Sequence, residues 1–253
     1  MDLGLTGTRA LVWGGSKGLA RACAAALAAE GVAVTIAART RATLEATAAD
    51  LNLAWVEADL TTVEGRAAAL AACPAPDILV NNAEGPKPGD FRTWQRADWH
   101  HALDAMMLGP IEMIRLVLDG MMERRFGRII NIVSRSVKAP QAELGLSNGS
   151  RAGLVGFVAG LARQTVSRGV TINNLLPGPF ATDAQRDHVE GLAARTGRPA
   201  AEIWAERTAA NPAGRFGEPA ELGAWCAFLC ARQSGFVTGQ NILIDGGDYR
   251  GTF

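Results

Sequence analysis

Seven short runs of aliphatic and β-branched residues alternate with alanine-rich stretches of helical length along the chain. The expected strands are residues 8–13, 32–38, 53–58, 77–81, 128–133, 170–176 and 241–245. The expected helices are residues 17–30, 41–51, 63–72, 98–125, 147–168 and 218–231. Because strands joined by crossover helices run parallel, this alternation predicts an α/β fold with a doubly wound parallel sheet and helices on both faces.

The domain organisation follows from the length and from the irregular segments. The 253 residues contain no linker-like or repeated segment, so we expect a single domain over residues 1–253. Residues 84–97 and about 180–217 are too long and irregular to be simple connections, and both follow predicted strands. The second segment is polar and is interrupted by Pro199 and Pro212, and it is expected to form a partly helical substrate lid.

The balance of charged residues indicates which classes of binding partner to expect. Lysine and arginine total 25, as do aspartate and glutamate, so neither a nucleic acid nor an anionic membrane is expected as a partner. No apolar run reaches the roughly 18 residues of a membrane span, and the amino terminus lacks the pattern of an export signal. The four cysteines show no metal-binding or redox spacing. We therefore expect a cytoplasmic protein that binds a small-molecule substrate and no metal.

A glycine-rich turn follows the first predicted strand. The sequence WGGSKGLA occupies residues 13–20 and opens a predicted helix. Glycines there let backbone N–H groups approach a pyrophosphate, and the helix amino terminus adds a favourable dipole. The residues expected to form this cofactor-binding turn are Gly14, Ser16, Lys17, Gly18 and Leu19.

The end of the second strand indicates which dinucleotide binds. An acidic residue there would hold the adenosine 2′-hydroxyl of NAD, but this chain has Arg39. Arg39 and Lys17 form a basic pair suited to a 2′-phosphate, which favours NADP over NAD. The alternative is that both are ordinary exposed charges.

Further cofactor contacts are expected where later strands end, because the ligand crevice of an open α/β sheet lies at that edge. An acceptor for the adenine amino group, the crevice edge, and a rigid turn beside the nicotinamide are expected in that order. They are Asp59 and Leu60 after the third strand, Asn82 and Ala83 at the fourth, and Pro177, Gly178 and Thr182 after the sixth.

The segments GGSKGLA, ADL, NNA, GRIINIVS, NNLLPGPFATD, GRFGEPAELG and TGQNILIDGG occur in an order and spacing that resemble the short-chain dehydrogenase/reductase family. The similarity to β-ketoacyl-carrier-protein-reductase-like members covers roughly residues 3–247. The resemblance implies a Rossmann fold with a seven-stranded sheet, a nicotinamide cofactor, and a homotetramer or homodimer. In such an assembly the helices at 98–125 and 147–168 would pair between subunits.

The resemblance also identifies catalytic positions, and three of the four differ here. The family uses an asparagine, a serine and a Tyr-x-x-x-Lys pair, in which the tyrosine protonates the substrate oxygen and the lysine lowers its pKa and holds the nicotinamide ribose. The family serine corresponds to Ser134, but the asparagine corresponds to Met106, the tyrosine to Ser147 and the lysine to Arg151. The chain resembles a divergent branch with Ser-Asn-x-x-Arg at this place.

These replacements remove the usual proton donor. Arg151 stays protonated, but it can bind ribose hydroxyls and hold positive charge beside a developing alkoxide. Ser147 can pass a proton only through a relay, and loss of a placed general acid typically costs ~10²–10⁴ in rate. Glu84 at the crevice rim and Tyr249 reaching a neighbouring subunit are alternative donors. For both, an ordinary exposed or loosely ordered position is the favoured interpretation.

Three functions are compatible with this pattern. The favoured hypothesis is an NADP-dependent oxidoreductase for a small or medium carbonyl or alcohol, in which Ser134 binds the substrate oxygen, Arg151 holds ribose and charge, and Ser147 links to water. The second is a cofactor-independent lyase; halohydrin dehalogenases also have arginine at the lysine position, but they keep the tyrosine and lose the glycine turn. The third is an NADP-binding pseudoenzyme or sensor, favoured by Trp13 and Glu84 because both could crowd or repel a cofactor.

Overall fold

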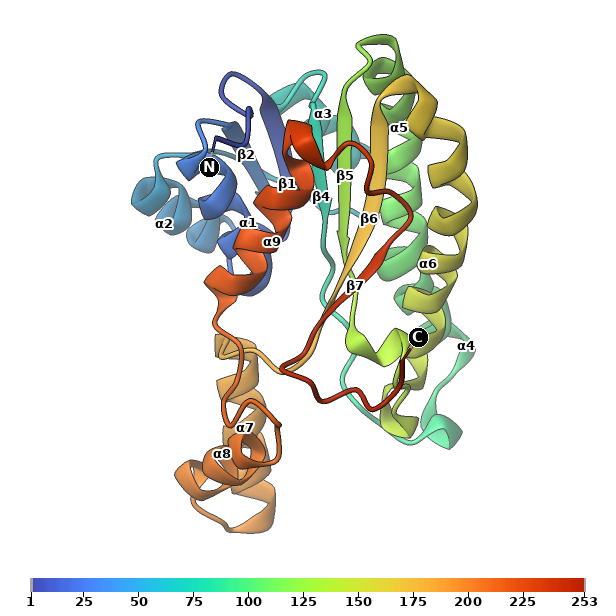
Figure 1. Ribbon diagram of the computed structural model, residues 1–253. Helices are drawn as coiled ribbons and strands as arrows, with labels where there is room; N and C mark the ends of the chain where they lie inside the picture. The colour runs from blue at the N-terminus through green and yellow to red at the C-terminus, as the bar shows by residue number, and fades with distance from the viewer. Residues whose placement is uncertain (1, 253) are drawn as a thin grey trace.

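A seven-stranded parallel sheet forms the centre of the molecule, as the strand–helix alternation predicts (Figure 1). The computed structural model describes residues 2–252. The strands are β1 (Arg9–Trp13), β2 (Ala33–Ala38), β3 (Ala54–Glu57), β4 (Ile78–Asn81), β5 (Gly127–Ile132), β6 (Val170–Pro177) and β7 (Asn241–Ile244). Their order is β3-β2-β1-β4-β5-β6-β7, and all neighbours are parallel. The sheet therefore has the doubly wound Rossmann topology.

Helices cover both faces of the sheet. The helices α1 (Gly18–Ala29), α2 (Arg41–Leu51) and α9 (Pro219–Cys230) pack on one face, and α3 (Val63–Ala72), α5 (Gly109–Glu123) and α6 (Gly145–Thr165) pack on the other. Every residue of β5 is buried, as expected for a strand covered on both sides. Within residues 2–252, none of the helices has the length and apolar character needed to cross a bilayer.

The helix expected over residues 98–125 is present as one continuous helical segment, but a π-helical turn interrupts its α-helical pattern. The structure has α4 (Arg96–Leu103), a π-helical turn (Asp104–Leu108) and then α5. Pro110 has no N–H to give to the carbonyl of Met106, and its ring disfavours a regular α-helix at that point. The Gly109 N–H bonds instead to the carbonyl of Asp104, five residues back. The resulting π turn carries Met106 to a buried position, 2% exposed, against the site.

A row of asparagine side chains crosses the four neighbouring strands β4, β5, β6 and β7. Asn81 Nδ2 donates to Asn131 Oδ1 at 2.9 Å, and Asn131 Nδ2 donates to Asn174 Oδ1 at 2.9 Å. Asn174 Nδ2 donates to Asn241 Oδ1 at 2.8 Å. At the other end, Asn81 Oδ1 and the Nε1 of Trp13 are both buried without a hydrogen-bond partner among the described residues. The row ties together the strands from which the site loops emerge.

The segment expected to be a lid contains two helices, α7 (Asp183–Thr196) and α8 (Ala200–Ala209), which project from the carboxyl edge of the sheet (Figure 1). A β-bridge between Phe180 and Gly217 closes the neck of this segment. The Ala181 N–H donates to the Gly217 carbonyl at 2.8 Å, and the Gly217 N–H donates to the Pro179 carbonyl at 3.0 Å. A Cβ at position 217 would lie 2.7 Å from the Phe180 ring, so this neck requires glycine.

Candidate active site

The glycines of the turn after β1 let its backbone come close to neighbouring groups. Gly14 has φ +66° and Gly18 has φ +54°, both in the left-handed region that favours glycine. A Cβ at Gly14 would lie 2.5 Å from Asn82 Nδ2, so the ends of β1 and β4 meet here. The exposed Lys17 precedes α1, and no side chain caps the first N–H groups of that helix. The turn therefore presents open donors and the positive end of a helix dipole.

The base of the lid lies across this turn. A Cβ at Gly18 would be 3.8 Å from Cγ2 of Thr182, which precedes α7. Behind it, the Gly178 N–H donates to the carbonyl of Ile244 at 2.8 Å. A Cβ at Gly178 would lie 2.6 Å from Cβ of Asp245, so β7 approaches the Pro177–Gly178 turn closely. The fold thus brings two distant predicted segments, the glycine turn and the loop after β6, to one crevice.

Three predicted cofactor residues face the protein interior. Ser16 is 9% exposed and its carbonyl accepts from the Thr47 hydroxyl at 2.9 Å. Leu19 is half-buried against the core under α1, and Leu60 is buried in the core of the opposite face. Trp13, one of the two residues that could crowd or repel a cofactor in the pseudoenzyme hypothesis, is also in that second core and is 2% exposed. Its indole therefore packs beneath the turn rather than over it.

A charged cluster lies beside the carboxyl ends of β2, β3 and β4. Arg39 Nη2 donates to Glu84 Oε2 at 3.2 Å, which joins the ends of β2 and β4. Asp59 Oδ1 accepts from the Thr61 N–H at 2.9 Å and from its hydroxyl at 2.8 Å. Burial raises the pKa of Asp59, but these bonds, with the charges of Arg39 and His101, hold it below its ordinary value. Asp59 is therefore a carboxylate beside Arg39, able to accept a hydrogen bond.

Arg151 joins α6 to the ends of two strands. Its Nη1 donates to the carbonyls of Ile132 at 3.0 Å and Val133 at 2.8 Å. Its Nη2 donates to the carbonyl of Ala83 at 3.0 Å. The side chain is thus held rigidly below the crevice, with Ser134 following directly after one of its partners.

The Arg151 charge has no counter-ion in the described part of the chain. Its Nε donates to Ser147 Oγ at 3.1 Å, and no carboxylate forms an ion pair with it among residues 2–252. Burial lowers the pKa of Arg151 from 12.5 to about 10, so it remains a cation at neutral pH. The predicted Ser147–Arg151 pair is therefore present as a neutral hydroxyl beside a buried, fixed positive charge.

Ser134 is positioned by the turn that follows β5. Its Oγ accepts from the Ser136 N–H at 3.1 Å, and the 3-10 turn Arg135–Val137 begins after it. The hydroxyl hydrogen of Ser134 is left to donate, and the residue is half-buried. It can therefore donate to a substrate oxygen at the edge of the crevice.

The two alternative proton donors each contact a basic side chain. Glu84 is exposed and paired with Arg39, so the apolar walls that would favour its protonated form are missing. The Tyr249 ring lies over Nζ of Lys138 in the same chain, 5.8 Å from its centroid. Asp248, beside it, forms an ion pair with Arg135. The carboxyl-terminal segment is thus tied to the loop that follows Ser134.

Gly85, which sequence reasoning missed, borders the Ser147–Arg151 pair. A Cβ built at Gly85 would lie 3.8 Å from each of Ser147 Oγ, Arg151 Nη2 and Met106 Sδ. Gly85 is exposed and therefore covers these three groups from the solvent side. Its sequence signal is weak, because it consists only of a small residue after Glu84.

A glycine turn at a helix amino terminus, at the carboxyl edge of a parallel sheet, defines the class of Rossmann-fold dinucleotide-binding proteins. Residues 14–248 match the family model described as enoyl-(acyl carrier protein) reductase. The chain is 33% identical to the 3-oxoacyl-(acyl-carrier-protein) reductase of Vibrio harveyi, with 98% of this chain and 99% of that protein covered. It is 32% identical to the acetoacetyl-CoA reductase of Shinella zoogloeoides, over 95% and 98% of the two chains. The chain belongs to the short-chain dehydrogenase/reductase family.

Solved structures agree with this assignment. L-sorbose reductase from Gluconobacter frateurii, in complex with NADPH and L-sorbose, superposes with a TM-score of 0.95 at 25% identity and full coverage of both chains. The NADPH-dependent reductase YwfH, involved in bacilysin biosynthesis, has a TM-score of 0.90 at 26% identity, over 97% of this chain and 99% of that one. The chain is therefore similar, over nearly its whole length, to reductases.

Proposed function

We propose that the protein is an NADP-dependent oxidoreductase that transfers hydride to or from a small or medium carbonyl or alcohol. The observation that carries this proposal is the crevice in which the Gly14–Gly18 turn, the open end of α1 and Thr182 meet. The basic residues Lys17 and Arg39 would supply positive charge at its adenosine side. Similarity to reductases whose structures contain NADPH supports the same cofactor.

The residues of the crevice fit NADP by their chemistry. The backbone of the glycine turn and α1 would hold the pyrophosphate, and Arg39 with Lys17 would hold the 2′-phosphate. Asp59 would accept from the adenine amino group, and the Pro177–Gly178 turn with Thr182 would border the nicotinamide. Asn82 and Ala83 would form the opposite edge. When bound, the cofactor supplies or accepts the hydride.

The protein residues then manage the substrate oxygen. Ser134 would donate a hydrogen bond to that oxygen, and the fixed charge of Arg151 would stabilise negative charge developing on it. Ser147 would connect the site to water, from which the proton comes. Four of the five N–H donors of Arg151 are already bonded within the chain, which leaves one for a ribose hydroxyl or a substrate. Arg151 thus acts chiefly by its charge.

The test measures binding and turnover separately. Calorimetry with NADP and NADPH should show binding, and NADPH oxidation against a panel of carbonyl compounds should show turnover. Ser134→Ala and Arg151→Ala should lower the rate, whereas Gly235→Ala, whose added Cβ would make only ordinary contacts far from the glycine turn, should leave it unchanged. An absence of NADP binding at millimolar excess would overturn the proposal.

A second candidate is an NADP-binding sensor without turnover. The observation that favours it is the bonding of Arg151 to three backbone carbonyls. Tight NADP binding with no oxidation of NADPH on any substrate would select this function. The lyase hypothesis is disfavoured, because the glycine turn is fully formed.

We also propose self-association through α5 and α6. Leu116 on α5 is 44% exposed and Phe157 on α6 is 39% exposed. On α6, a Cβ at Gly156 or Gly160 would meet no atom within 4 Å, so a second chain can approach closely. Light scattering should give a dimer or tetramer, and Phe157→Glu should dissociate it.

A further inference from the structure

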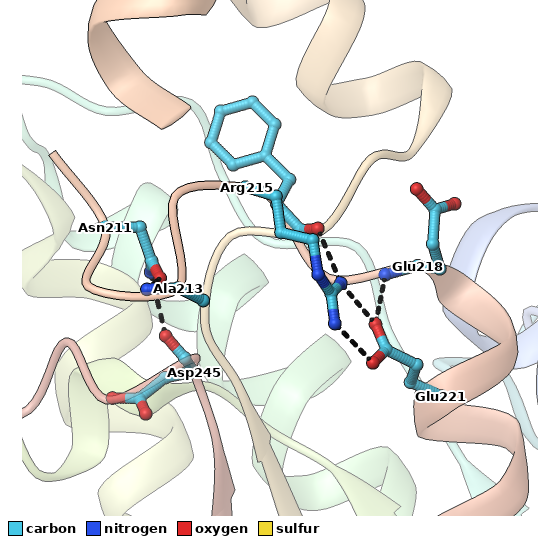
Figure 2. Close-up of polar contacts among 7 residues, drawn as sticks. Asn211, Ala213, Arg215, Glu218, Glu221 and Asp245 are labelled. Atoms are coloured by element: carbon cyan, nitrogen blue, oxygen red, sulfur yellow. Dashed lines mark hydrogen bonds and ion pairs between the residues drawn. The ribbon is translucent and has the colours of Figure 1, made fainter. Parts of the chain in front are cut away.

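Residues 245–249 follow β7 and run from the loop after β6 to the turn that carries Ser134. Asp245 is the anchor of this segment, which we call the 245–249 strap. The Asp245 carbonyl accepts from Asn211 Nδ2 at 2.9 Å (Figure 2), and a Cβ at Gly178 would lie 2.6 Å from Cβ of Asp245. The strap is therefore fixed at its start between the loop after β6 and the loop after α8.

The Asp245 carboxylate also orders the backbone on both sides of Asp248. Its Oδ1 accepts from the Gly247 N–H at 3.0 Å, and its Oδ2 accepts from the Tyr249 N–H at 2.8 Å. An aspartate that bonds to backbone N–H groups a few residues later holds the chain in a turn. Because both of its neighbours are held in this way, Asp248 loses little further freedom when its side chain binds a partner.

The strap contacts the Ser134 turn at two places. Asp248 forms an ion pair with Arg135, and their side chains are only 29% and 26% exposed. The Tyr249 ring lies over Nζ of Lys138, 5.8 Å from its centroid. An ion pair shielded to this degree is screened less by water and salt than a fully exposed pair. Since Arg135 directly follows Ser134, a shift of the Arg135 backbone would displace Ser134 as well.

The hydrogen bonds of the Ser134 turn itself are internal. Within the described residues, Ser134 Oγ accepts from the Ser136 N–H, and the carbonyls of Ser134 and Arg135 accept from N–H groups two to four positions later. These bonds set the shape of the turn but do not connect it to other elements. The ion pair of Arg135 with Asp248 makes such a connection.

We propose that Asp248 is a positioning residue, which pairs with Arg135 and thereby fixes the turn from which the Ser134 hydroxyl donates to the substrate oxygen. This inference rests on the proposed function and deepens it, because it names a residue outside the crevice on which the oxygen contact depends. Asp248 acts through Arg135 and contacts neither substrate nor cofactor in this role. Because Asp245 lies against Gly178, the strap also links the Ser134 turn to the turn proposed to border the nicotinamide.

Hydrogen exchange measures the hold of the strap on the turn without requiring turnover. Three N–H groups donate to carbonyls within the turn and exchange when it opens, namely those of Val137, Lys138 and Ala139. Asp248→Asn keeps the shape of the side chain but removes its charge, and it should raise these exchange rates about fivefold. Unchanged rates in Asp248→Asn would overturn the proposal.

Asp77→Asn is the matched control. Asp77 forms a similarly part-buried ion pair with Arg124, and it precedes β4 at the opposite edge of the sheet. Its substitution should leave exchange in the Ser134 turn unchanged. Thermal unfolding of both variants checks that they are folded. Faster exchange in the Ser134 turn of Asp77→Asn as well would show a general loosening and would count against a specific role for Asp248.

A double-mutant cycle tests whether Asp248 acts through Ser134. With the most active carbonyl compound of the panel, Asp248→Asn should lower kcat/KM about fivefold in the wild-type background. In the Ser134→Ala background it should lower kcat/KM less than about twofold, because the hydroxyl that it positions is gone. Equal losses in the two backgrounds would mean that Asp248 supports the fold in general, and the proposal would be wrong.

The two measurements separate this inference from the proposed function. If NADPH is oxidised while Asp248→Asn changes neither exchange nor rate, the oxidoreductase stands and the role of Asp248 is wrong. If exchange rises in Asp248→Asn but NADP fails to bind, the proposed function is wrong, whereas the hold of Asp248 on the Ser134 turn stands.

Discussion

Arg151 Nε donates a hydrogen bond to Ser147 Oγ at 3.1 Å, one turn earlier on α6. The resemblance to the family assigns these two residues to the positions of its tyrosine and lysine, and here the bond places a buried cation beside a hydroxyl oxygen. The serine is thereby kept as a donor, since its oxygen already accepts. Ser147 thus presents its O–H beside a buried positive charge.

Replacing Arg151 should destabilise the fold. Arg151→Met removes the cost of a buried charge but leaves the carbonyls of Ala83, Ile132 and Val133 without their donor. Unpaired buried acceptors cost about 1–3 kcal/mol each, so we expect a net loss of about 2–4 kcal/mol in the free energy of unfolding, measured in urea. The free energy of unfolding of Arg151→Lys should lie between those of the wild type and Arg151→Met, because one ammonium group cannot reach all three carbonyls. A fully stable Arg151→Met variant would contradict this role.

An alanine substitution should destabilise the protein more in the middle of the asparagine row than at its end. Asn131→Ala removes a buried residue that bonds to both neighbours, so Asn81 and Asn174 each lose a partner. We expect a loss of about 2–4 kcal/mol in the free energy of unfolding. Asn241→Ala, at the half-buried end of the row, removes one bond and should cost about 1 kcal/mol. Equal costs at the two positions would argue against a cooperative row.

Substitutions in the Arg39–Glu84 pair should change the affinity for NADPH and not the affinity for NADH. Arg39→Ala removes the cation proposed for the 2′-phosphate and should weaken NADPH binding about tenfold. Glu84→Gln frees Arg39 from an exposed ion pair, worth at most about 1 kcal/mol, and should strengthen NADPH binding by up to about fivefold. Glu64→Gln, an exposed acid in the first turn of α3, is the control. Fluorescence titration at low salt measures both cofactors, and an equal shift for NADH would refute the assignment.

The loop between α8 and α9 should stabilise the protein at neutral pH and lose this contribution in acid. Arg215 Nη1 and Nη2 donate to the two oxygens of Glu221 at 2.7 Å, and the Glu218 N–H donates to the same carboxylate (Figure 2). The bonds from Arg215 and the Glu218 backbone lower the pKa of Glu221 from 4.5 to about 2. The folded state therefore favours the carboxylate form, and its contribution is present above pH 4.5 and is lost as the pH falls towards 2.

Glu221→Gln tests this contribution. Both side chains are about half exposed, so screening limits the loss at pH 7 to about 0.5–1 kcal/mol. The difference between wild type and variant should shrink below pH 4.5, as followed by urea unfolding at a series of pH values. A difference that stays constant with pH would show that the charge of Glu221 is not the cause.

The sequence alone determined the elements of the sheet and the place of the crevice. Predicted and observed strands agree to within a residue or two at each end, because apolar runs and the glycines and polar residues that end them are local signals. The glycine turn and the Pro177–Gly178 loop were predicted to meet for a similar reason, since parallel strands bring their carboxyl ends to one edge. The missed interruption at the π turn also had a local cause in Pro110.

Only the tertiary structure decided which side chains are partners. The row from Asn81 to Asn241 joins residues 43 to 67 positions apart, although each strand had shown an asparagine among apolar residues. The bond from Arg151 to Ala83 and the pairing of Arg39 with Glu84 likewise span 68 and 45 positions. Such partners depend on strand register and on how α6 packs against the sheet. Local periodicity fixes the elements, but the donors and acceptors of the site are paired by packing between them.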